Sequence, residues 1–258
     1  MNLELKDKVA VVAGASRGIG LSIAQSLSRE GCKVLICARN AETLDNAASF
    51  VRESGGDTET LVLDITDKNA GALLVEKALS DFGQIDIYVG SAGGNRRKPF
   101  ADTTDSDWHE IMDINFHAHA RCSRAIIPAM RDAGGGAITF ISSIFGREAG
   151  GPGLSIYNAT KSALISLAKI MAIELGADGI RVNTVAPGSI RYPGGSWDRR
   201  CMEDPEGMAK FIQENLPMGR FGNAEEVADV VAFLSSARAS WISGACITVD
   251  GVQSRSLI

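Results

Sequence analysis

Residues 9–20 read V-A-V-V-A-G-A-S-R-G-I-G, an apolar run that ends in a glycine-rich turn. The apolar run predicts a buried strand, and the pattern from about Gly18 to Glu30 predicts a helix directly after it. A turn between a strand and a helix leaves backbone N–H groups free at the helix N-terminus, where a pyrophosphate can bind. Gly14, Gly18 and Gly20 let the backbone approach phosphates closely. The stretch therefore predicts a dinucleotide-binding α/β fold; a tight turn without a ligand is the alternative.

The same alternation continues along the chain. Short apolar runs predict strands at residues 9–13, 34–38, 59–64, 85–90, 137–142, 181–186 and 246–250. Helical patterns lie between them, at residues 18–30, 41–54, 69–82, 106–133, 155–177 and 224–235. Repeated strand–helix units with nearly continuous apolar strands indicate a parallel sheet covered by helices on both faces. Right-handed crossovers then give one doubly wound Rossmann domain over residues 1–258, with a seven-stranded parallel sheet.

Residues 189–222 interrupt this alternation with a polar segment that contains several glycines and prolines. A long segment without regular structure inside a compact domain is usually a lid or a binding loop. We therefore expect residues 189–222 to cover the substrate, with a short helix at Met208–Asn215; a flexible surface loop is the alternative. Trp197 and Tyr192 are candidate apolar walls for the substrate.

The composition bounds the class of protein. The chain has 258 residues, of which 45% are hydrophobic and 22% charged, enough for one large core. A net charge of −5 without a long basic block argues against nucleic acid as a partner. No apolar run approaches the roughly 20 residues of a membrane span, and the N-terminus lacks the apolar region of a signal peptide. Five cysteines without a C-x-x-C pair indicate reduced thiols, so we expect a cytoplasmic protein.

The second predicted strand ends in C-A-R-N, residues 37–40, where a dinucleotide-binding fold places the group that reads the ribose. An acid there would bind the 2′-OH of NAD(H), but this chain has Arg39, with Arg17 in the glycine turn. Two guanidinium groups suit a 2′-phosphate, which arginine binds in bidentate fashion. The sequence therefore favours NADP(H) as the cofactor; a solvated surface role is the alternative for Arg39.

Residues 155–161 read S-I-Y-N-A-T-K and place Tyr157 four residues before Lys161 in a predicted helix. Residues at i and i+4 share a helix face, so the phenol and the ammonium point the same way. A nearby cation lowers the pKa of a tyrosine from its free value of about 10. Such a tyrosine is a candidate general acid or base; the alternative is an aromatic side chain that packs beside a lysine.

The order of these motifs resembles that of the short-chain dehydrogenase/reductase family, from K-D-K-V-A-V-V-A-G-A-S-R-G-I-G at residues 6–20 to I-S-G-A-C-I-T-V-D-G at residues 242–251. The resemblance implies no metal. The catalytic residues that it implies are Asn115, Ser143, Tyr157 and Lys161. Besides Tyr157 and Lys161, the cofactor-binding residues expected from the motifs and the resemblance are Gly14, Ser16, Arg17, Gly18, Ile19, Gly20, Arg39, Asp64, Ile65, Ala92, Gly93, Pro187, Gly188 and Ile190.

The resemblance also implies a role for each catalytic residue. Tyr157 is expected to protonate the carbonyl oxygen of a substrate while NADPH delivers a hydride to its carbon. Lys161 is expected to lower the pKa of Tyr157 and to hydrogen-bond the nicotinamide ribose. Ser143 would hold the substrate oxygen, and Asn115 would position a water that relays protons to Lys161. The implied reaction is the NADP(H)-dependent interconversion of a ketone and a secondary alcohol.

The chain departs from the family at two places. Gly90 and Ser91 precede Ala92 and Gly93, where the family usually has asparagine. Arg191 replaces a common threonine after the sixth predicted strand. We read the first departure as a change in local hydrogen bonding beside the cofactor.

Within the family, the chain most resembles the 3-oxoacyl-(acyl-carrier-protein) reductases. Those enzymes usually carry basic surface residues that bind an acidic carrier protein. Gly134 and Asp178 stand where a basic residue is common. This favours a free small ketone, a sugar-like one or a polycyclic one as the substrate. A reductase of a 3-oxoacyl thioester of carrier protein or coenzyme A is one alternative, and a non-catalytic NADP-binding sensor or scaffold is another.

The family commonly forms homotetramers. The two long predicted helices, residues 106–133 and 155–177, are rich in apolar residues. We therefore expect a homotetramer, or a homodimer, built on these helices.

Several polar groups have two interpretations. His117 and His119 do not share a helix face, which favours packing or surface roles over a metal site. Residues 95–98, N-R-R-K, follow the fourth predicted strand and either attract an anionic cofactor or substrate or form a solvated loop. Residues 198–206 carry both arginines and acids, and predict no charge preference.

Overall fold

The computed structural model describes residues 2–257 and forms one seven-stranded sheet in the order β3-β2-β1-β4-β5-β6-β7. The strands are β1 (Val9–Ala13), β2 (Lys33–Ala38), β3 (Thr58–Val62), β4 (Ile87–Gly90), β5 (Gly136–Ile141), β6 (Ile180–Pro187) and β7 (Cys246–Val249). Every neighbouring pair in this sheet is parallel. The predicted doubly wound α/β fold with a seven-stranded parallel sheet is confirmed.

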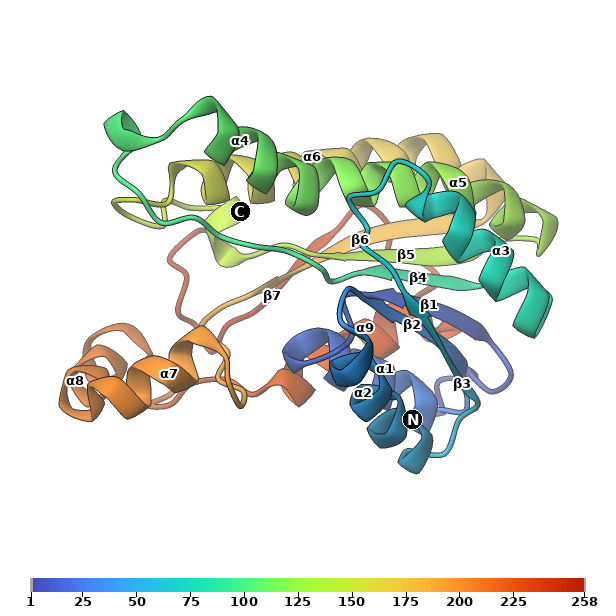
Figure 1. Ribbon diagram of the computed structural model, residues 1–258, viewed down its shortest axis with the longest axis horizontal. Coiled ribbons are helices and arrows are strands. Elements are labelled where there is room, and N and C mark those ends of the chain that lie inside the picture. The colour runs from blue at the N-terminus through green and yellow to red at the C-terminus, as the bar shows by residue number, and fades with distance from the viewer. Residues whose placement is uncertain (1, 258) are drawn as a thin grey trace.

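Helices cover both faces of the sheet (Figure 1). The helices are α1 (Gly18–Arg29), α2 (Ala41–Glu53), α3 (Ala70–Phe82), α4 (Asp105–Met112), α5 (Ala118–Asp132), α6 (Ser155–Leu175), α7 (Ser196–Glu203), α8 (Pro205–Asn215) and α9 (Ala224–Ser235). Helices α1, α2 and α9 lie on one face, and α3, α5 and α6 on the other, as Figure 1 shows. None of the helices in the described part of the chain has the length and apolar character needed to cross a bilayer.

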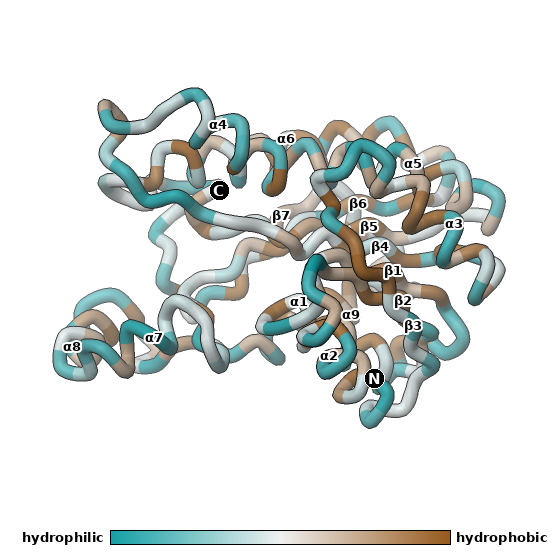
Figure 2. Tube along the Cα trace, viewed as in Figure 1, coloured by the Kyte–Doolittle hydropathy of each residue, from teal (hydrophilic) through white to brown (hydrophobic). Residues whose placement is uncertain are grey.

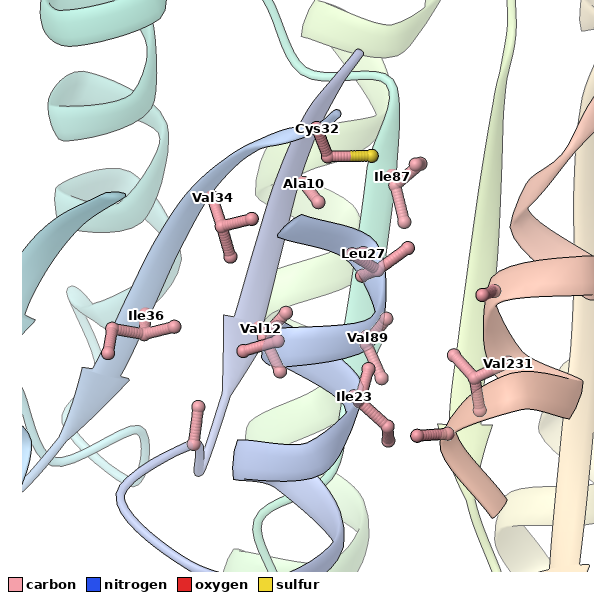
Figure 3. Packing of buried hydrophobic residues seen from close by; sticks show 14 of the residues in the cluster. Ala10, Val12, Ile23, Leu27, Cys32, Val34, Ile36, Ile87, Val89 and Val231 are labelled. Carbon is pink, nitrogen blue, oxygen red and sulfur yellow. The ribbon is translucent and has the colours of Figure 1, made fainter. Parts of the chain in front are cut away.

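Two apolar cores, one on each face, hold these layers together. Alternate residues of β1 enter them: Val12 packs in the core under α1 and α9, and Val11 in the core under α3 and α5. In Figure 3, Val12 lies among Ile23 and Leu27 of α1 and residues of β2 and β4. Figure 2 shows the central strands as a hydrophobic band between more polar helices. Burial on both faces explains why the strands appear in the sequence as nearly continuous apolar runs.

The order of the strands reverses next to β1, which pairs with β2 on one side and β4 on the other. Ala13 at the end of β1 lies opposite Gly90 at the end of β4. In doubly wound folds a crevice opens at this point, beyond the carboxyl ends of the strands. The glycine turn, the loop after β4 and the loop after β5 therefore meet at one edge of the sheet.

The helix predicted at residues 106–133 is interrupted. Helix α4 ends at Met112, a π-helical turn follows at Asp113–His117, and α5 begins at Ala118. The π-turn inserts an extra residue that shifts Asn115 inward, where its side chain hydrogen-bonds Gly94. The predicted long helix is confirmed over residues 105–132, apart from this π-helical turn, which has no local pattern in the sequence.

Residues 189–222 are more regular than the sequence predicted. They contain α7 and α8, which lie apart from the sheet in Figure 1. The predicted helix at Met208–Asn215 falls inside α8, which starts earlier because the Asp204 side chain accepts a hydrogen bond from the backbone of Gly207 and Pro205 occupies the first turn. Stacked rings of Trp197 and Phe211 join the two helices.

Asn183 on β6 offers a test of how the last strand is held. Its amide donates to the Ile242 carbonyl at 2.9 Å and accepts from the Ala245 backbone at 3.0 Å, and its side chain is buried. We expect Asn183→Ala to lower the free energy of unfolding by about 2–4 kcal/mol, because two backbone groups lose their partners. Denaturant titration measures the loss. Asn69→Ala, at an exposed helix start without a capping bond, should cost under about 0.5 kcal/mol; equal losses would contradict the assignment.

Candidate active site

The turn between β1 and α1 is shaped by glycines. Gly14 and Gly18 have φ values of 83° and 57°, in the left-handed region that favours glycine. A Cβ on Gly20 would lie 2.2 Å from the Gly14 carbonyl oxygen. Larger residues therefore cannot build this turn, which presents the N-terminus of α1 to the crevice.

A cavity of about 490 Å³ lies at this turn. It is bounded by the glycine turn, the end of β2, the loop after β3 and the loop after β4. The predicted cofactor residues that line it are Gly14, Ser16, Arg17, Ile19, Gly20, Arg39, Asp64, Ile65, Ala92 and Gly93. The structure thus brings together residues that are far apart in the sequence. Polar side chains and backbone groups line the cavity and suit a dinucleotide.

Arg39 and Asp64 lie at the end of this cavity nearest β2 and β3. The Arg39 Nη1 atom is 3.9 Å from Asp64 Oδ2, a loose ion pair between exposed side chains. Asp64 Oδ1 accepts hydrogen bonds from the Thr66 backbone at 2.9 Å and the Thr66 hydroxyl at 2.8 Å. Burial raises the pKa of the Asp64 carboxyl, but the Thr66 hydrogen bonds and Arg39 lower it overall. Asp64 is therefore oriented and ionised, while Arg39 remains accessible to an anion.

Tyr192 lies over the glycine turn. A Cβ on Gly18 would meet the Tyr192 ring at 2.7 Å, and Tyr192 lines the 490 Å³ cavity. Tyr192 and Trp197 were expected to form walls of the substrate site. A second, larger cavity, described next, is lined by Trp197 but not by Tyr192. Gly195, whose Cβ would lie 2.9 Å from the Tyr192 ring, allows this fold-back.

The second cavity has a volume of about 890 Å³ and contains Ser143 and Tyr157. Its walls come from the loop after β4, the loop between β5 and α6, helices α7 and α8, and the chain after β7. Ile141 at the end of β5 lines the smaller cavity, and Ser143, two residues on, lines the larger. The two cavities therefore meet at the carboxyl end of β5.

Ser143 and Tyr157 are brought together by the loop between β5 and α6. Asn158 donates to the carbonyls of Phe145 and Glu148, at 2.7 and 2.8 Å, and so ties this loop to the first turn of α6. Burial raises the pKa of the Tyr157 phenol; a hydrogen bond with Ser143 acts in the opposite direction, and Tyr192 adds to the rise. The phenol is therefore protonated at neutral pH.

Lys161 is buried beneath Tyr157. Its Nζ atom donates to the Ile141 carbonyl at 2.8 Å and lies 5.7 Å from the centre of the Tyr157 ring. Burial lowers the pKa of Lys161 to about 8. The pKa of the Tyr157 phenol is raised, mainly by burial; that Lys161 lowers it stays a prediction.

Asn115 connects the loop after β4 to α6. Its Oδ1 atom accepts from the Gly94 backbone at 2.8 Å, and its Nδ2 donates to the Gly94 carbonyl at 2.9 Å and to Thr160 Oγ1 at 3.0 Å. A Cβ on Gly93 would lie 3.1 Å from Asn115 Oδ1 and 3.4 Å from Lys161 Nζ. Asn115 and Lys161 are therefore neighbours behind the cavity walls rather than part of them.

The residues after β6 are only partly placed as expected. Pro187 ends β6, and Gly188 lines the larger cavity. Ile190 is buried and its side chain packs on Gly222, where a Cβ would lie 2.7 Å from Ile190 Cδ1. Ile190 lines neither of the two cavities described above, so only its backbone is available to a cofactor.

His119 is a buried group that the sequence did not single out for this site. Its Nε2–H donates to the Ala92 carbonyl at 2.8 Å, and its Nδ1 lies 3.5 Å from the Tyr88 hydroxyl. A Cβ on Gly90 would lie 2.6 Å from Nδ1. The sequence signal for this buried histidine was the glycine at position 90 in place of asparagine, because only glycine there leaves room for the imidazole ring beside the Ala92 backbone.

No group of three or more His, Cys, Asp or Glu side chains within residues 2–257 is arranged to hold a metal ion.

Comparison with known proteins identifies the family. Residues 14–251 match the family model described as enoyl-(acyl carrier protein) reductase. This match covers most of the chain, and full-length relatives agree with it. The chain belongs to the short-chain dehydrogenase/reductase family of oxidoreductases.

Individual relatives cover nearly the whole chain. Gluconate 5-dehydrogenase of Gluconobacter oxydans is 37% identical over 94% of this chain and 93% of its own length. A 3-oxoacyl-[acyl-carrier-protein] reductase of Escherichia coli is 36% identical over 97% of this chain and 98% of its own. The crystal structure of L-sorbose reductase from Gluconobacter frateurii, complexed with NADPH and L-sorbose, superposes with a TM-score of 0.94 at 33% identity, covering 100% of both chains.

The buried His119 predicts a pH dependence of stability. Burial lowers its pKa to about 4, against about 6.5 in an unfolded chain. Between these values the unfolded chain binds a proton that the folded chain excludes, so lowering the pH from 6.5 to 4 removes up to about 3 kcal/mol of stability. His119→Gln keeps a donor for Ala92 without titrating in this range, and should lose correspondingly less over that interval in denaturant titrations.

The exposed neighbour His117 supplies the control. His117→Gln should show the same pH dependence as the unmodified chain. Parallel curves for the chain and for His119→Gln would contradict a neutral, buried imidazole at position 119.

Proposed function

We propose that this chain is an NADP(H)-dependent oxidoreductase that interconverts a ketone and a secondary alcohol. The observation that carries the proposal is the pairing of Ser143 and Tyr157 in a cavity of about 890 Å³ that meets a second, dinucleotide-sized cavity at the end of β5. The NADPH complex of the similar L-sorbose reductase supports the choice of cofactor.

The residues around the smaller cavity fit NADP(H). The glycine turn and the N-terminus of α1 suit the pyrophosphate, since free backbone N–H groups and the helix dipole favour anions. Arg17 and Arg39 suit the 2′-phosphate, and the oriented carboxylate of Asp64 suits the adenine amino group. NADP(H), when bound, supplies or accepts the hydride.

Tyr157 acts as the general acid when a ketone is reduced. Because burial raises its pKa, the phenol carries its proton at neutral pH and can donate it to the carbonyl oxygen. Ser143 Oγ lies at the same cavity wall and hydrogen-bonds the substrate oxygen as negative charge develops on it. In the reverse direction the phenolate accepts the proton of the alcohol, so oxidation should be favoured at higher pH than reduction.

Lys161 and Asn115 lie behind the cavity wall and are placed to return the proton that Tyr157 donates. The buried amine of Lys161 has a pKa of about 8, so it gains or loses a proton near neutral pH. Asn115 holds the Gly93–Gly94 backbone beside Lys161 through its bonds to Gly94 and Thr160. This arrangement supports a proton relay that ends at Tyr157.

A 3-oxoacyl thioester is the second candidate substrate, supported by the carrier-protein reductase relative. Against carrier-protein docking, Asp178 places an acid where a base is common, and it is paired with Arg131 at 2.7 Å. The predicted lid role of residues 189–222, the homotetramer and the cytoplasmic location stay predictions.

Tyr157→Phe tests the mechanism. It should lower kcat by about 10²- to 10⁴-fold, because the proton donor is lost, and should affect the Kd for NADPH far less. The assay is NADPH oxidation with a panel of ketoses, β-ketoesters, diketones and cyclic ketones. Undiminished turnover in the variant would rule out this role for Tyr157, and tight NADPH binding without any turnover in the unmodified chain would favour the sensor alternative.

Arg39→Gln tests the choice of cofactor. It should raise the Kd for NADPH about tenfold, the usual scale for losing one charge-assisted contact, and leave the Kd for NADH unchanged. Fluorescence titration of both cofactors measures the ratio. Arg29→Gln, at the exposed end of α1, should alter neither constant; equal effects on NADPH and NADH in Arg39→Gln would speak against a 2′-phosphate contact.

A further inference from the structure

The larger cavity collects positive charge. Arg97, Arg200 and Arg255 line it from three separate segments: the loop after β4, helix α7 and the chain after β7. Glu148 is the only acid among its lining residues. The excess is local, because the chain as a whole carries a net charge of −5.

Each of these arginines makes a contact with another part of the protein. The stem of Arg97 packs on Gly153, where a Cβ would lie 2.9 Å from Arg97 Cγ. The guanidinium of Arg200 lies over the Trp197 ring at 4.9 Å from its centre. The backbone N–H of Arg255 donates to Glu148 at 2.8 Å. The three side chains are therefore directed to one cavity by contacts that leave their charges in place.

These charges are not neutralised by protein acids. None of the three arginines forms an ion pair with an Asp or Glu side chain of residues 2–257. The one acid of the cavity is already engaged, since Glu148 Oε2 accepts hydrogen bonds from the backbone of both Arg255 and Ser256. An anion that enters the cavity would meet three guanidinium groups and one carboxylate, whose Oε2 is already held by backbone donors.

The cofactor does not account for this charge. The glycine turn, Arg17 and Arg39 line the smaller cavity, and none of the three arginines does. The three arginines share their cavity with Ser143 and Tyr157 instead. The rest of the wall is mixed: uncharged polar side chains (Asn95, Ser189, Ser196, Asn215 and Gln253) stand beside apolar ones (Ile144, Phe145, Leu154, Trp197 and Phe211).

We propose that the substrate is a polar ketone that bears an anionic group, a carboxylate or a phosphate, bound by Arg97, Arg200 and Arg255 while its carbonyl lies at Tyr157. The proposal rests on the oxidoreductase function above and names the substrate class of that same site. Guanidinium groups bind both anions through paired N–H donors. The neutral polar residues of the wall suit hydroxyl groups on the carbon chain between the anion and the ketone.

A matched pair of ketones tests the proposal. 5-Keto-D-gluconate and L-sorbose have the same carbon chain and configuration, and differ only in a carboxylate in place of a hydroxymethyl group. With NADPH, kcat/KM should be at least about tenfold higher for the keto acid, mainly through KM, and the advantage should shrink at high salt. An equal or lower value for the keto acid overturns a carboxylate-binding site. D-Fructose 6-phosphate against D-fructose tests the phosphate in the same way, and no preference in either pair overturns the proposal.

Variants of the arginines locate the effect. Arg200→Gln and Arg97→Gln, singly and together with Arg255→Gln, should reduce stepwise the preference for the anion, measured as the ratio of kcat/KM for the keto acid to kcat/KM for the neutral ketone. Arg199→Gln is the control, because Arg199 is the neighbour of Arg200 on α7, donates to the Gly194 carbonyl and does not line the cavity. An undiminished preference in the triple variant, with NADPH binding intact, overturns the assignment to these residues.

Binding separates this proposal from the proposed reaction. If no ketone of any kind is turned over, the oxidoreductase function fails, yet the anion site can still be measured. D-Gluconate and D-glucitol form the corresponding pair of alcohols, and a thermal shift with NADP⁺ present should be larger for D-gluconate and lost in the triple variant. Equal shifts overturn the anion site whatever the outcome of the kinetic assay.

Discussion

The close approach of backbone at the glycine turn is the constraint on which the rest of the site depends. Gly20 lies against the Gly14 carbonyl, and a Cβ on Gly14 would lie 2.6 Å from the Ala92 backbone after β4. Only glycine, which has no side chain, lets the first strand, the first helix and the loop after β4 approach one another so closely at these positions. This contact aims α1 at the crevice and places Ala92 and Gly93 on its far wall, which defines the smaller cavity.

Buried polar groups then hold the catalytic wall. Asn115 joins Gly94 to Thr160, Lys161 donates to Ile141, and His119 donates to Ala92, so each buried donor has a backbone or hydroxyl partner. Burial also sets their chemistry, because it lowers the pKa of Lys161 to about 8 and that of His119 to about 4. Exclusion of water makes an unpaired buried polar group costly. It also lets Lys161 exchange protons near neutral pH and keeps His119 neutral.

Most of the framework follows from local pattern. The central strands were predictable because they are buried on both faces and therefore apolar, and the glycine turn because its spacing serves a backbone need. The features that the sequence did not show arise where a distant contact overrides local pattern. The π-turn at Asp113–His117 forms to bring Asn115 to Gly94, and Tyr192 folds over Gly18 although nothing near it in the chain requires this. The pKa of Tyr157 is raised mainly by burial, which the sequence does not show.

The sequence by itself determined the doubly wound fold class, the dinucleotide turn and the residues at which chemistry is expected, because each can be recognised from the spacing of residues along the chain. Only the tertiary structure decided which charges line the larger cavity. In N-R-R-K at residues 95–98, Arg96 and Lys98 pair with acids of α4, and Arg97 lines the large cavity. Among residues 198–206, Asp198 pairs with Arg191, and only Arg200 lines that cavity. Charges that cancel when counted along the chain are separated in space, because Arg96, Lys98 and Asp198 form ion pairs whereas Arg97 and Arg200 line the large cavity.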